Sequence, residues 1–595
     1  MAAASPKFVG TAQGTPMDGS FVDDAASFVD DVLTGYVQLH SGVLRYARDG
    51  EARCVFRRVL DANVVALLSG GGSGHEPAHA GFVGSGMLSG AVCGAVFASP
   101  TSSSVLRAIL EAASPAGVLL IVKNYTGDRI NFGVAEQRAR AMGVRVDTVV
   151  VADDVALPLN TVTGRRGLAG TLFVHKIAGA AAAAGLSLDD VAAEARAAAS
   201  AVATVGVALS RATVPGSPAS QTCRIPSGCM DYGGGIHGEA GAEQIAAEGA
   251  AATVNRMIHR LLHNEHVDIP AGSRVAMLVN SLGATSPGEL ALLGGLAIAS
   301  MRRAGLAVMR CYTGALMTSL DAHGVSISLL RIDNDTMLQR LDADTSAPAW
   351  PRALPLPVDT DDSALCVLAK EPPSASTADD THAGPPVTPL GRSMCAAIAA
   401  AAHALVALEQ QLDAWDTVSG DGDCGSTLAR GARAVLSDLP AYKLDSLPHT
   451  LAGLAGSVRA AVGGTSGALL DVLFTAAEAH ARNATETATI VGALDAGVQA
   501  LMRVGGAHEG MRTMVDALMP AVRACSSCPS DASPSAIALA AAIAAEAGAE
   551  ATRAMIAKAG RASYVESGAL LHAGVPDPGA YAVAAVLRAV ASELK

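Results

Sequence analysis

Residues 117–128 read GVLLIVKNYTGD, an apolar run that stops abruptly at polar and turn-forming residues. Such a run is typical of a short strand buried on both faces. The stretches 64–72 (VVALLSGGG), 145–154 (RVDTVVVADD) and 274–283 (RVAMLVNSLG) repeat the pattern, with helical segments between them. This alternation predicts an α/β region with parallel-type sheets, in which ligands gather beyond the carboxyl ends of the strands.

The pattern divides the chain into regions of different composition. Strand and helix signals alternate over residues 20–353, whereas residues 354–391 are rich in Pro, Ser, Thr and Asp and predict an exposed linker. Over residues 392–595 strand signals nearly vanish and small residues recur at helical spacing, which predicts an all-helical bundle or barrel. Residues 1–19 are interpreted as an N-terminal extension.

Composition excludes several classes of protein. The chain has 595 residues, more than one hydrophobic core normally supports, and 50% of them are hydrophobic. A net charge of −13 argues against a nucleic-acid partner, because phosphate neutralisation needs clustered Lys and Arg. We expect no membrane span, since the apolar run Ala536–Ala545 is too short, and no secretory signal. The C-terminal residues ELK are not the usual peroxisomal tripeptide, so a cytoplasmic location is expected.

The ten cysteines do not form a disulfide or metal pattern. Cys525 and Cys528 make a single C-x-x-C without the two further ligands that zinc needs. Cys223 and Cys229 lie near His237 in sequence but lack a fourth ligand. Buried thiols are the favoured interpretation.

The stretch YGGGIHGEAG, residues 232–241, places one histidine among glycines. It matches G-x-G-x-x-G, but no apolar strand precedes it, so a dinucleotide fingerprint is disfavoured. Glycines let a ligand approach the main chain closely, which makes the imidazole the chemical feature of the loop. A surface turn and a working site both remain open on these residues alone.

Three aspartates follow the first predicted helix of the C-terminal region, in WDTVSGDGDCG. The spacing of Asp416, Asp421 and Asp423 lets a tight turn bring all three carboxylates together, where they would repel one another without a cation. Mg²⁺ takes such oxygen ligands and bridges them to nucleotide phosphates, and two ions would exceed the three carboxylates by one positive charge. A calcium loop and a plain capped turn are the alternatives, although the EF-hand glutamate is missing.

The stretch 462–470, VGGTSGALL, reads as a loop that enters a helix. Its N–H groups and the hydroxyls of Thr465 and Ser466 can receive phosphate oxygens at the helix N-terminus, or the glycines can serve close helix packing. No P-loop and no protein-kinase HRD or DFG motif occurs in the sequence.

Motifs from both regions resemble those of single-chain, ATP-dependent dihydroxyacetone kinases. They run in order from about residue 20 to the end and comprise SGGGSGHEPAHAGFVG, VCGAVFASP, VKNYTGDRINFG, GGGIHGEAG, GDGDCG, GGTSGA, MRTMVDAL, GRASYV and DPGAYA. The resemblance implies an α/β substrate domain and an antiparallel helical barrel that binds nucleotide. It also implies phosphoryl transfer from Mg-ATP to dihydroxyacetone, with glyceraldehyde as a second substrate, and a homodimer.

The resemblance assigns roles in the substrate domain. His237 would form a covalent hemiaminal with the substrate carbonyl, a bond that glycerol cannot make. Asp128 would be the general base, and His75 would orient or polarise the substrate. The implied substrate-binding residues are Gly72, Ser73, Gly74, His75, Lys123 and Asp128.

In the helical domain, Asp416, Asp421 and Asp423 carry over as ligands of two Mg²⁺ ions. The implied nucleotide contacts are Asp421, Gly422, Asp423, Cys424, Thr465, Ser466, Arg512, Thr513, Met514, Asp577, Pro578 and Gly579. One position departs from the family, which usually has Asp where this chain has Met511. An acidic neighbour of the nucleotide is therefore missing.

Other activities remain open at this stage. Some members of the family split FAD to AMP and cyclic FMN at the nucleotide site. A phosphoprotein donor is disfavoured because both domains share one chain, and a carbonyl-sugar sensor is disfavoured because the aspartates are retained. The sequence does not determine the preferred triose, the flavin activity, the dimer contacts, the role of the N-terminal extension or a regulatory partner.

Overall fold

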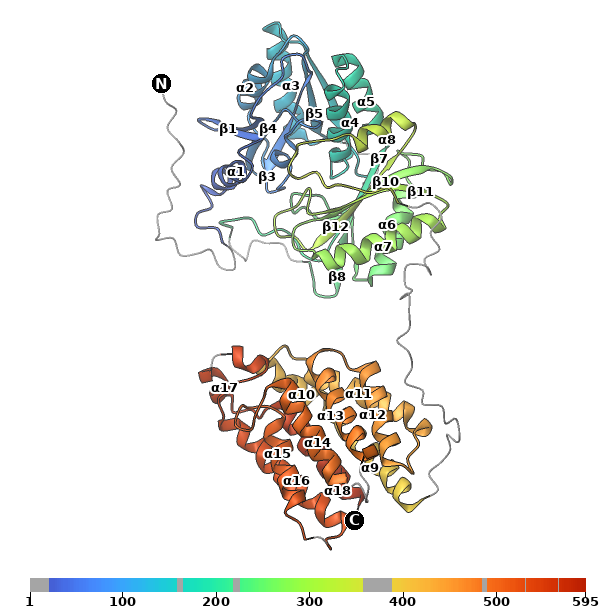
Figure 1. The fold of residues 1–595 in the computed structure, drawn as a ribbon. Coiled ribbons are helices and arrows are strands. Elements are labelled where there is room, and N and C mark those ends of the chain that lie inside the picture. Colours follow the sequence, from blue (N-terminus) through green and yellow to red (C-terminus); the bar gives the residue numbers. More distant parts are fainter. Residues whose placement is uncertain are drawn as a thin grey trace. The chain divides into compact units, whose positions relative to one another are not determined.

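The computed structural model describes residues 21–157, 164–217, 225–356, 388–483, 490–529, 531–565 and 567–594. The chain forms two compact units, residues 1–369 and residues 370–595, each of which is described by itself (Figure 1). The predicted extension at 1–19 and most of the predicted linker lie outside the described residues.

The N-terminal unit contains two six-stranded sheets. The first has the order β1-β2-β4-β3-β5-β6 and the second the order β11-β10-β12-β7-β8-β9. The strands are β1 Leu44–Asp49, β2 Ala52–Arg57, β3 Ala66–Ser73, β4 Gly90–Val96, β5 Val118–Lys123, β6 Val146–Val151, β7 Val202–Ala208, β8 Cys229–Tyr232, β9 Glu243–Ala246, β10 Arg274–Ser281, β11 Ala307–Gly314 and β12 Gly324–Arg331.

Helices cover both sheets and separate them. They are α1 Phe28–Leu39, α2 Ser102–Ala112, α3 Thr126–Ala141, α4 Thr171–Ala183, α5 Leu188–Ala201, α6 Ala250–Leu262, α7 Pro287–Arg303 and α8 Asp335–Asp342. α2 and α3 pack on one face of the first sheet, whereas α4 and α5 pack on its other face and also contribute to a core shared with the second sheet. α6 and α7 cover the outer face of the second sheet.

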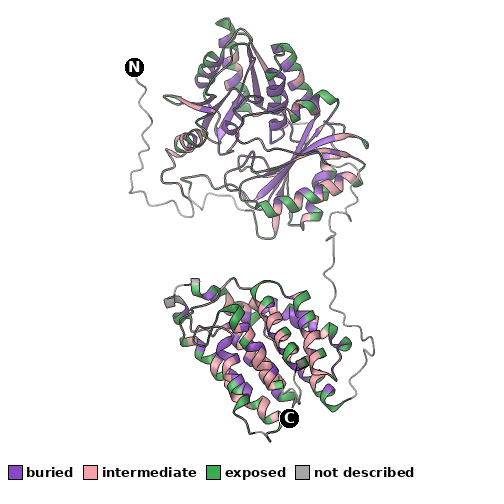
Figure 2. Ribbon diagram, viewed as in Figure 1, coloured by how far each residue is buried: buried purple, intermediate pink, exposed green. Residues whose placement is uncertain are grey.

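The position of β5 explains its uninterrupted apolar sequence. Every residue of this strand is buried, because helices lie on both of its faces (Figure 2). Leu119 and Ile121 enter the core shared with α4 and α5, and the alternate residues Leu120 and Val122 enter the core with α2 and α3. A strand with period-two side chains and two apolar neighbours must be apolar throughout.

Burial on every side also explains the mainly apolar sequence of helix α4. All of its residues from Thr171 to Ala182 are buried, so it has no polar face for water. A helix that is apolar all round belongs in the interior. Lys176 departs from this apolar pattern, and its ammonium donates to the carbonyls of Arg340 and Ala343 at the end of α8, which satisfies two of its three N–H donors.

The sheets are mixed, which corrects the prediction of parallel-type sheets. β4, β3, β5 and β6 are parallel, as predicted, but β1 and β2 join the first sheet antiparallel. In the second sheet only β10 and β11 are parallel. Short connections explain two of the antiparallel pairs, β1–β2 and β8–β9, because strands joined without a crossover helix can pair only antiparallel. The antiparallel pairs β2–β4, β10–β12 and β12–β7 are set by the course of longer connections.

The C-terminal unit is helical throughout its described residues. Its helices are α9 Pro389–Ala407, α10 Glu409–Ser419, α11 Cys424–Asp438, α12 Leu447–Ala461, α13 Gly464–Asn483, α14 Ile490–Gly505, α15 Val515–Ser526, α16 Pro534–Ala551, α17 Ser567–Ala573 and α18 Pro578–Glu593. The contacts run from α9 through α11, α12, α13, α14, α15, α16 and α18 and return to α9. α9 starts before residue 392, where the sequence analysis placed the domain boundary.

Two helices of this unit are long and apolar enough to cross a bilayer by length and composition, namely Pro389–Ala407 and Pro534–Ala554. Both pack against other helices of the unit, α9 against α11 and α18, and α16 against α15 and α18. Core helices of a folded domain pass the same test. The uninterrupted apolar run considered in the sequence analysis was shorter than either helix.

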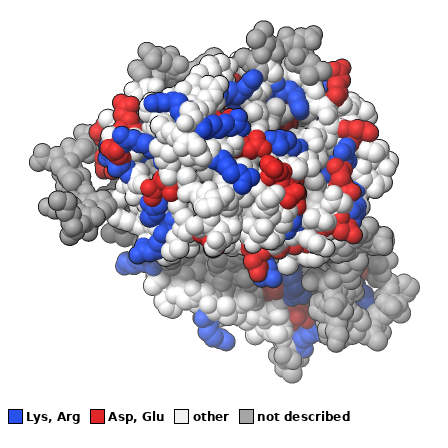
Figure 3. Space-filling view, turned by 90° about the horizontal axis from the view of Figure 1, so that it is seen from above, with Lys and Arg blue, Asp and Glu red and all other residues white. Residues whose placement is uncertain are grey.

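Charged side chains of both signs mix on the surface. On the face shown in Figure 3, Lys and Arg lie between Asp and Glu without forming one large basic area. Such a face does not concentrate positive potential for a nucleic-acid backbone.

A buried carboxylate anchors the chain where it passes between the two sheets. Asp153 follows β6, is fully buried, and accepts hydrogen bonds from the backbone N–H groups of Leu168 at 2.6 Å and Gly170 at 2.9 Å. The hydroxyl of Thr204 on β7 also donates to it. This carboxylate therefore holds residues 164–170 against both sheets.

We predict that Asp153→Ala lowers the free energy of unfolding by about 3 kcal/mol, because it leaves buried donors without an acceptor. Urea unfolding of the full chain, followed by the fluorescence of Trp350 in a Trp415→Phe background, reports on this unit. The control Asp189→Ala removes an exposed carboxylate from the first turn of α5 and should change the free energy by less than about 1 kcal/mol. Equal effects of the two substitutions would contradict the prediction.

Candidate functional site

Four rings from both sheets of the N-terminal unit meet at one point. His75 follows β3, Phe97 follows β4 and Tyr125 follows β5, whereas His237 comes from the loop between β8 and β9. The ring of His237 lies 4.7 Å from His75, 5.5 Å from Phe97 and 4.5 Å from Tyr125 between centroids, and is nearly perpendicular to each. The structure thus brings together the two predicted catalytic histidines, which are far apart in sequence.

His75 is held in one tautomer. Its ring is fully buried, and Nδ1 lies 2.8 Å from the carbonyl oxygen of Thr318. Because that oxygen can only accept, Nδ1 carries the proton and Nε2 carries the lone pair. Nε2 has no hydrogen-bond partner among the described residues, so it is available to a ligand hydroxyl.

Lys123 and Asp128 lie at the carboxyl end of β5, beside β3. Both are buried, and a Cβ added at Gly71 would lie 3.3 Å from Asp128 Oδ2 and 3.4 Å from Lys123 Nζ. Only glycine leaves this space open, since Gly71 also has a φ of +152°. The hydroxyl of Ser99 donates to Asp128, whereas Lys123 Nζ has no hydrogen-bond partner in the described part of the chain.

The electrostatics of this site keep its imidazoles neutral. Burial lowers the pKa of His237 to about 3, and the positive charges of Lys123 and Arg166 act in the same direction. Burial, Lys123 and His237 also hold the pKa of His75 well below its usual value. Burial raises the pKa of Asp128, which the nearby Lys123 partly offsets, so this carboxylate is a stronger base than an exposed one.

The remaining predicted substrate-binding residues form the turn after β3. Gly72 and Ser73 end the strand, and the hydroxyl of Ser73 donates to the carbonyl of Gly94 at 2.8 Å. The N–H of Gly74 donates to the carboxylate of Glu76 at 3.0 Å. The Ser73 hydroxyl proton is therefore already used inside the protein.

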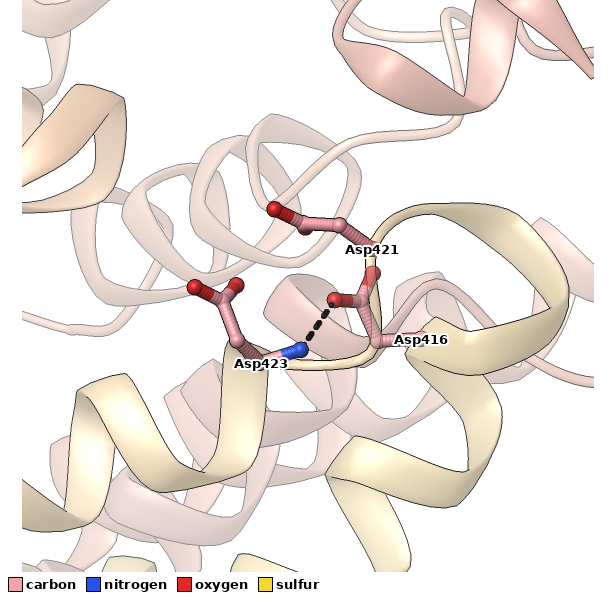
Figure 4. Close-up of side chains that lie close together, drawn as sticks. All are labelled: Asp416, Asp421 and Asp423. Carbon is pink, nitrogen blue, oxygen red and sulfur yellow. Dashed lines mark hydrogen bonds between the residues drawn. The ribbon is translucent and has the colours of Figure 1, made fainter. Parts of the chain in front are cut away.

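The C-terminal unit brings the three predicted metal ligands together. The side chain of Asp416 lies beside those of Asp421 and Asp423, and one carboxylate oxygen from each residue lies within 4.8 Å of the others (Figure 4). Oδ2 of Asp416 accepts from the N–H groups of Gly422 at 3.1 Å, Asp423 at 3.0 Å and Cys424 at 3.2 Å. This bonding shapes the loop, and Asp421 also contacts the guanidinium of Arg561.

The donor set of this cluster fits Mg²⁺. It consists of carboxylate oxygens, two of the three side chains are exposed, and the loop holds the negative charges close together. Hard divalent cations prefer such ligands and keep the remaining positions for water or phosphate. The aspartate cluster can therefore hold the metal of a metal-nucleotide complex.

A buried acidic residue, Asp577, lies near the aspartate cluster. Trp415 packs edge-on against Tyr581 at 4.9 Å, which places the end of α10 beside the start of α18. Asp577 accepts from the N–H of Ala580 at 2.8 Å at that start. Burial raises the pKa of Asp577 to about 6, and Asp516 and Asp416 push it in the same direction.

Arg512 is the buried cation of this region. It is 1% exposed, has a φ of +61°, and donates from Nη2 to the carbonyl of Val575 at 2.9 Å. Its Nη1 has no hydrogen-bond partner in the described ranges. An unpaired buried guanidinium nitrogen fits a site for an anionic or polar ligand. Of the neighbouring predicted residues, Thr513 and Met514 directly precede α15, and Pro578 and Gly579 are the first residues of α18.

Asp516 organises the loop that carries Met511 and Arg512. Asp516 accepts from the N–H groups of Gly510 and Thr513 and so holds the loop that carries Arg512. The sequence analysis missed this role of Asp516. Thr465 and Ser466 lie in the first turn of α13, as predicted, where helical N–H groups are free to bind an anion.

The sequence analysis also missed four side chains around His237, namely Phe97, Tyr125, Arg166 and Glu239. Phe97 and Tyr125 lie within the quoted motifs VCGAVFASP and VKNYTGD, so their motifs were a signal that they are near the site. Glu239 lies in the histidine loop itself. Arg166 had no sequence signal, because its role depends on contacts across the two sheets.

Comparisons with known proteins agree with this division of the chain. Residues 34–349 match the Dak1 domain and residues 418–592 match the DAK2 domain. A Solanum lycopersicum protein provisionally named 3,4-dihydroxy-2-butanone kinase is 44% identical, covering 96% of this chain and 98% of its own. Human triokinase/FMN cyclase is 40% identical, covering 96% and 99%. The crystal structure of the dihydroxyacetone kinase from C. freundii in complex with AMP-PNP and Mg²⁺ is similar at 36% identity and a TM-score of 0.64, covering 96% and 99%.

The pKa of His237 predicts a dependence of stability on pH. Its folded value of about 3 lies below the unfolded value of about 6.5, so the unfolded state binds more protons between them and stability falls as the pH drops through 6.5. When the pH is lowered from 7 to 5, the free energy of unfolding should fall by about 2 kcal/mol less in His237→Asn than in the unchanged chain. Urea unfolding at both pH values, followed through Trp350 as above, measures this, and an identical loss would refute it.

Proposed function

The chain belongs to the dihydroxyacetone kinase family, and on that premise we propose that it transfers the γ-phosphate of Mg-ATP to a hydroxyl of dihydroxyacetone, with the substrate held covalently on His237. It is an enzyme of the kinase class. The observation that carries the proposal is the partly buried imidazole of His237, whose pKa is lowered to about 3 and whose ring lies 4.7 Å from that of His75, beyond the carboxyl ends of β3 and β5.

The covalent step balances without an added reactant. A lone-pair nitrogen of His237 attacks the keto carbon, the carbonyl π electrons move to oxygen, and that oxygen takes one proton. The imidazole gives up one N–H proton in exchange, so the hemiaminal is neutral overall. This chemistry requires an unprotonated ring, which the lowered pKa of His237 supports.

Covalent binding gives specificity that hydrogen bonds alone do not. Dihydroxyacetone has only six heavy atoms, so its non-covalent binding has a ceiling of about 9 kcal/mol, and glycerol offers the same hydroxyls. A bond to the keto carbon favours dihydroxyacetone over glycerol, which has no carbonyl group. The relative named for 3,4-dihydroxy-2-butanone fits the same logic, because that compound also carries a hydroxyl next to a ketone.

The other groups at the site have separate duties. His75 accepts a hydrogen bond from the substrate through Nε2 and so orients it. The ammonium of Lys123, which has no hydrogen-bond partner among the described residues, donates a hydrogen bond to a substrate oxygen. Asp128 accepts the proton of the attacking hydroxyl, for which its raised pKa is suited. Glyceraldehyde, which has an aldehyde carbon for His237, is a second substrate.

In the helical domain, Asp416, Asp421 and Asp423 would hold two Mg²⁺ ions, which neutralise phosphate charge when bound. Arg512 and the α13 N-terminus with Thr465 and Ser466 would bind the nucleotide. The closed succession of helix contacts supports the interpretation of this domain as an antiparallel barrel. We also propose a cytoplasmic homodimer, on the family resemblance.

A second activity is favoured by one specific observation. Human triokinase/FMN cyclase covers nearly the full chain at 40% identity, so splitting of FAD to cyclic FMN at the same nucleotide site is the alternative use of the aspartates. Met511 replaces the family's aspartate beside this site, and the two activities would respond differently to Met511→Asp if the base or ribose is bound there.

A substrate panel tests the proposal. Dihydroxyacetone, glyceraldehyde, 3,4-dihydroxy-2-butanone and glycerol are each supplied with Mg-ATP while ADP is followed, and FAD is supplied without ATP. ADP release that requires a carbonyl substrate supports the kinase. Carbonyl binding without ADP above the substrate-free rate would instead indicate a sensor.

We predict that His237→Ala raises the KM for dihydroxyacetone and lowers its preference over glycerol, each by at least about 10-fold, because only the carbonyl can form the tether. Steady-state kinetics with both substrates measure the ratio. A variant that keeps the ratio of the unchanged enzyme would exclude the covalent role.

We predict that Asp421→Asn lowers kcat by at least about 100-fold while the carbonyl adduct still forms, because metal binding and substrate capture belong to different domains. The control Asp531→Asn removes an exposed carboxylate of the same unit and should retain full turnover. Turnover by Asp421→Asn at limiting Mg²⁺ equal to that of the control would contradict the assignment.

A further inference from the structure

The carboxylate of Glu239 folds back beneath the loop that carries His237. Oε2 of Glu239 accepts a hydrogen bond from the backbone N–H of His237 at 2.8 Å. Oε1 lies 3.3 Å from Nη1 of Arg166. One side chain therefore connects the main chain of His237 to a cation from outside the loop.

Arg166 is itself fixed to the body of the unit. Its guanidinium pairs with Asp154 at 2.7 Å, and Nη2 donates to the carbonyl of Gly233 at 2.6 Å. Asp154 is fully buried and the Arg166 side chain is 12% exposed, so this pair is largely shielded from water. Arg166 thus holds the first residue of the loop directly, and it holds His237 through Glu239.

Gly235 provides the space for the carboxylate. A Cβ at this position would lie 1.8 Å from Oε1 of Glu239 and 2.8 Å from Nη1 of Arg166. A methyl group would displace the end of the Glu239 side chain, which is free to swing away. At the neighbouring Gly234 an added Cβ meets no atom within 4 Å. The loop therefore needs a glycine at 235 for a reason that does not apply at 234.

We propose that Glu239, held by Arg166, is a positioning residue that sets the backbone of His237 and so aims its ring at the substrate carbon. The proposal rests on the covalent role of His237 given above. It assigns a purpose to Gly235, namely room for a carboxylate that braces the nucleophile.

The geometry explains why such a brace matters. The His237 ring stands edge-on to three rings at 4.5 to 5.5 Å, so a small rotation of its backbone redirects the attacking nitrogen. Covalent attack needs reacting atoms about 3 to 3.5 Å apart, and a misplacement of about 1 Å can cost on the order of 100-fold in rate. A charge-assisted hydrogen bond to the main chain restricts that motion.

The experiment uses the full-length enzyme and two matched pairs of variants. Gly235→Ala is compared with Gly234→Ala, and Glu239→Ala is compared with Glu243→Gln, which removes an exposed carboxylate on β9. Glu239→Gln is added because its amide oxygen still accepts from the His237 N–H but no longer pairs with Arg166. Carbon-13 NMR with dihydroxyacetone labelled at the keto carbon measures the hemiaminal, and kinetics and thermal midpoints are measured in parallel.

We expect Gly235→Ala and Glu239→Ala to lower the hemiaminal fraction and to raise the KM for dihydroxyacetone by at least about 10-fold, with the KM for ATP and the thermal midpoint unchanged. Glu239→Gln should fall between these variants and the unchanged enzyme. Gly234→Ala and Glu243→Gln should behave as the unchanged enzyme does.

The outcomes separate this inference from the proposed function. An unchanged enzyme without a hemiaminal signal overturns the covalent tether and the positioning role together. A hemiaminal that forms normally in the unchanged enzyme, in Gly235→Ala and in Glu239→Ala overturns the positioning role alone. A lower thermal midpoint in Glu239→Ala with an unchanged KM shows a merely structural brace and overturns it as well.

Discussion

The salt bridge between Asp154 and Arg166 joins the two sheets of the N-terminal unit at the point where the candidate site is built. Asp154 follows β6 of the first sheet, and its backbone forms an isolated parallel β-bridge with that of Thr204 on β7 of the second sheet. Arg166 extends from that junction to the loop of His237. A buried ion pair adds little net stability, but breaking it leaves a costly unpaired charge, so the pair commits both sheets to one arrangement.

From that junction the site receives groups that neither sheet supplies alone. β3, β4 and β5 contribute His75, Phe97 and Tyr125, and the loop between β8 and β9 contributes His237. The parallel strands end at the same edge, where their loops carry short polar motifs. The antiparallel strands β8 and β9 instead present a loop that faces this edge from the second sheet.

The two units use opposite electrostatics for their parts of the reaction. In the N-terminal unit, burial and the cation Lys123 keep imidazoles unprotonated, which suits the nucleophilic role proposed for His237. In the helical unit, exposed carboxylates gather in one loop, which suits a cation and a polyphosphate. Separate units allow each environment to be set without disturbing the other.

Much of this could be predicted from local sequence. The strand at 118–123 was predicted from an apolar run, and the approach of Asp416, Asp421 and Asp423 was predicted from their spacing across a tight turn. The predicted direction of the sheets was wrong in part, because sheet partners depend on the length and course of connections rather than on strand composition. Arg166 was missed because it acts on a backbone group far away in the chain, whereas Asp516 lies in the quoted motif MRTMVDAL and only its hydrogen bonds to the loop were missed.

By itself, the sequence determined the strands, the helices, the aspartate turn and the glycine-rich histidine loop, because these depend on interactions between residues near one another in the chain. Only the tertiary structure decided which strands pair, which rings surround His237 and what an added side chain at residue 235 would meet. Those features depend on contacts between segments tens to hundreds of residues apart. The effect of an ion pair such as Asp154–Arg166 likewise depends on the residues that bury it.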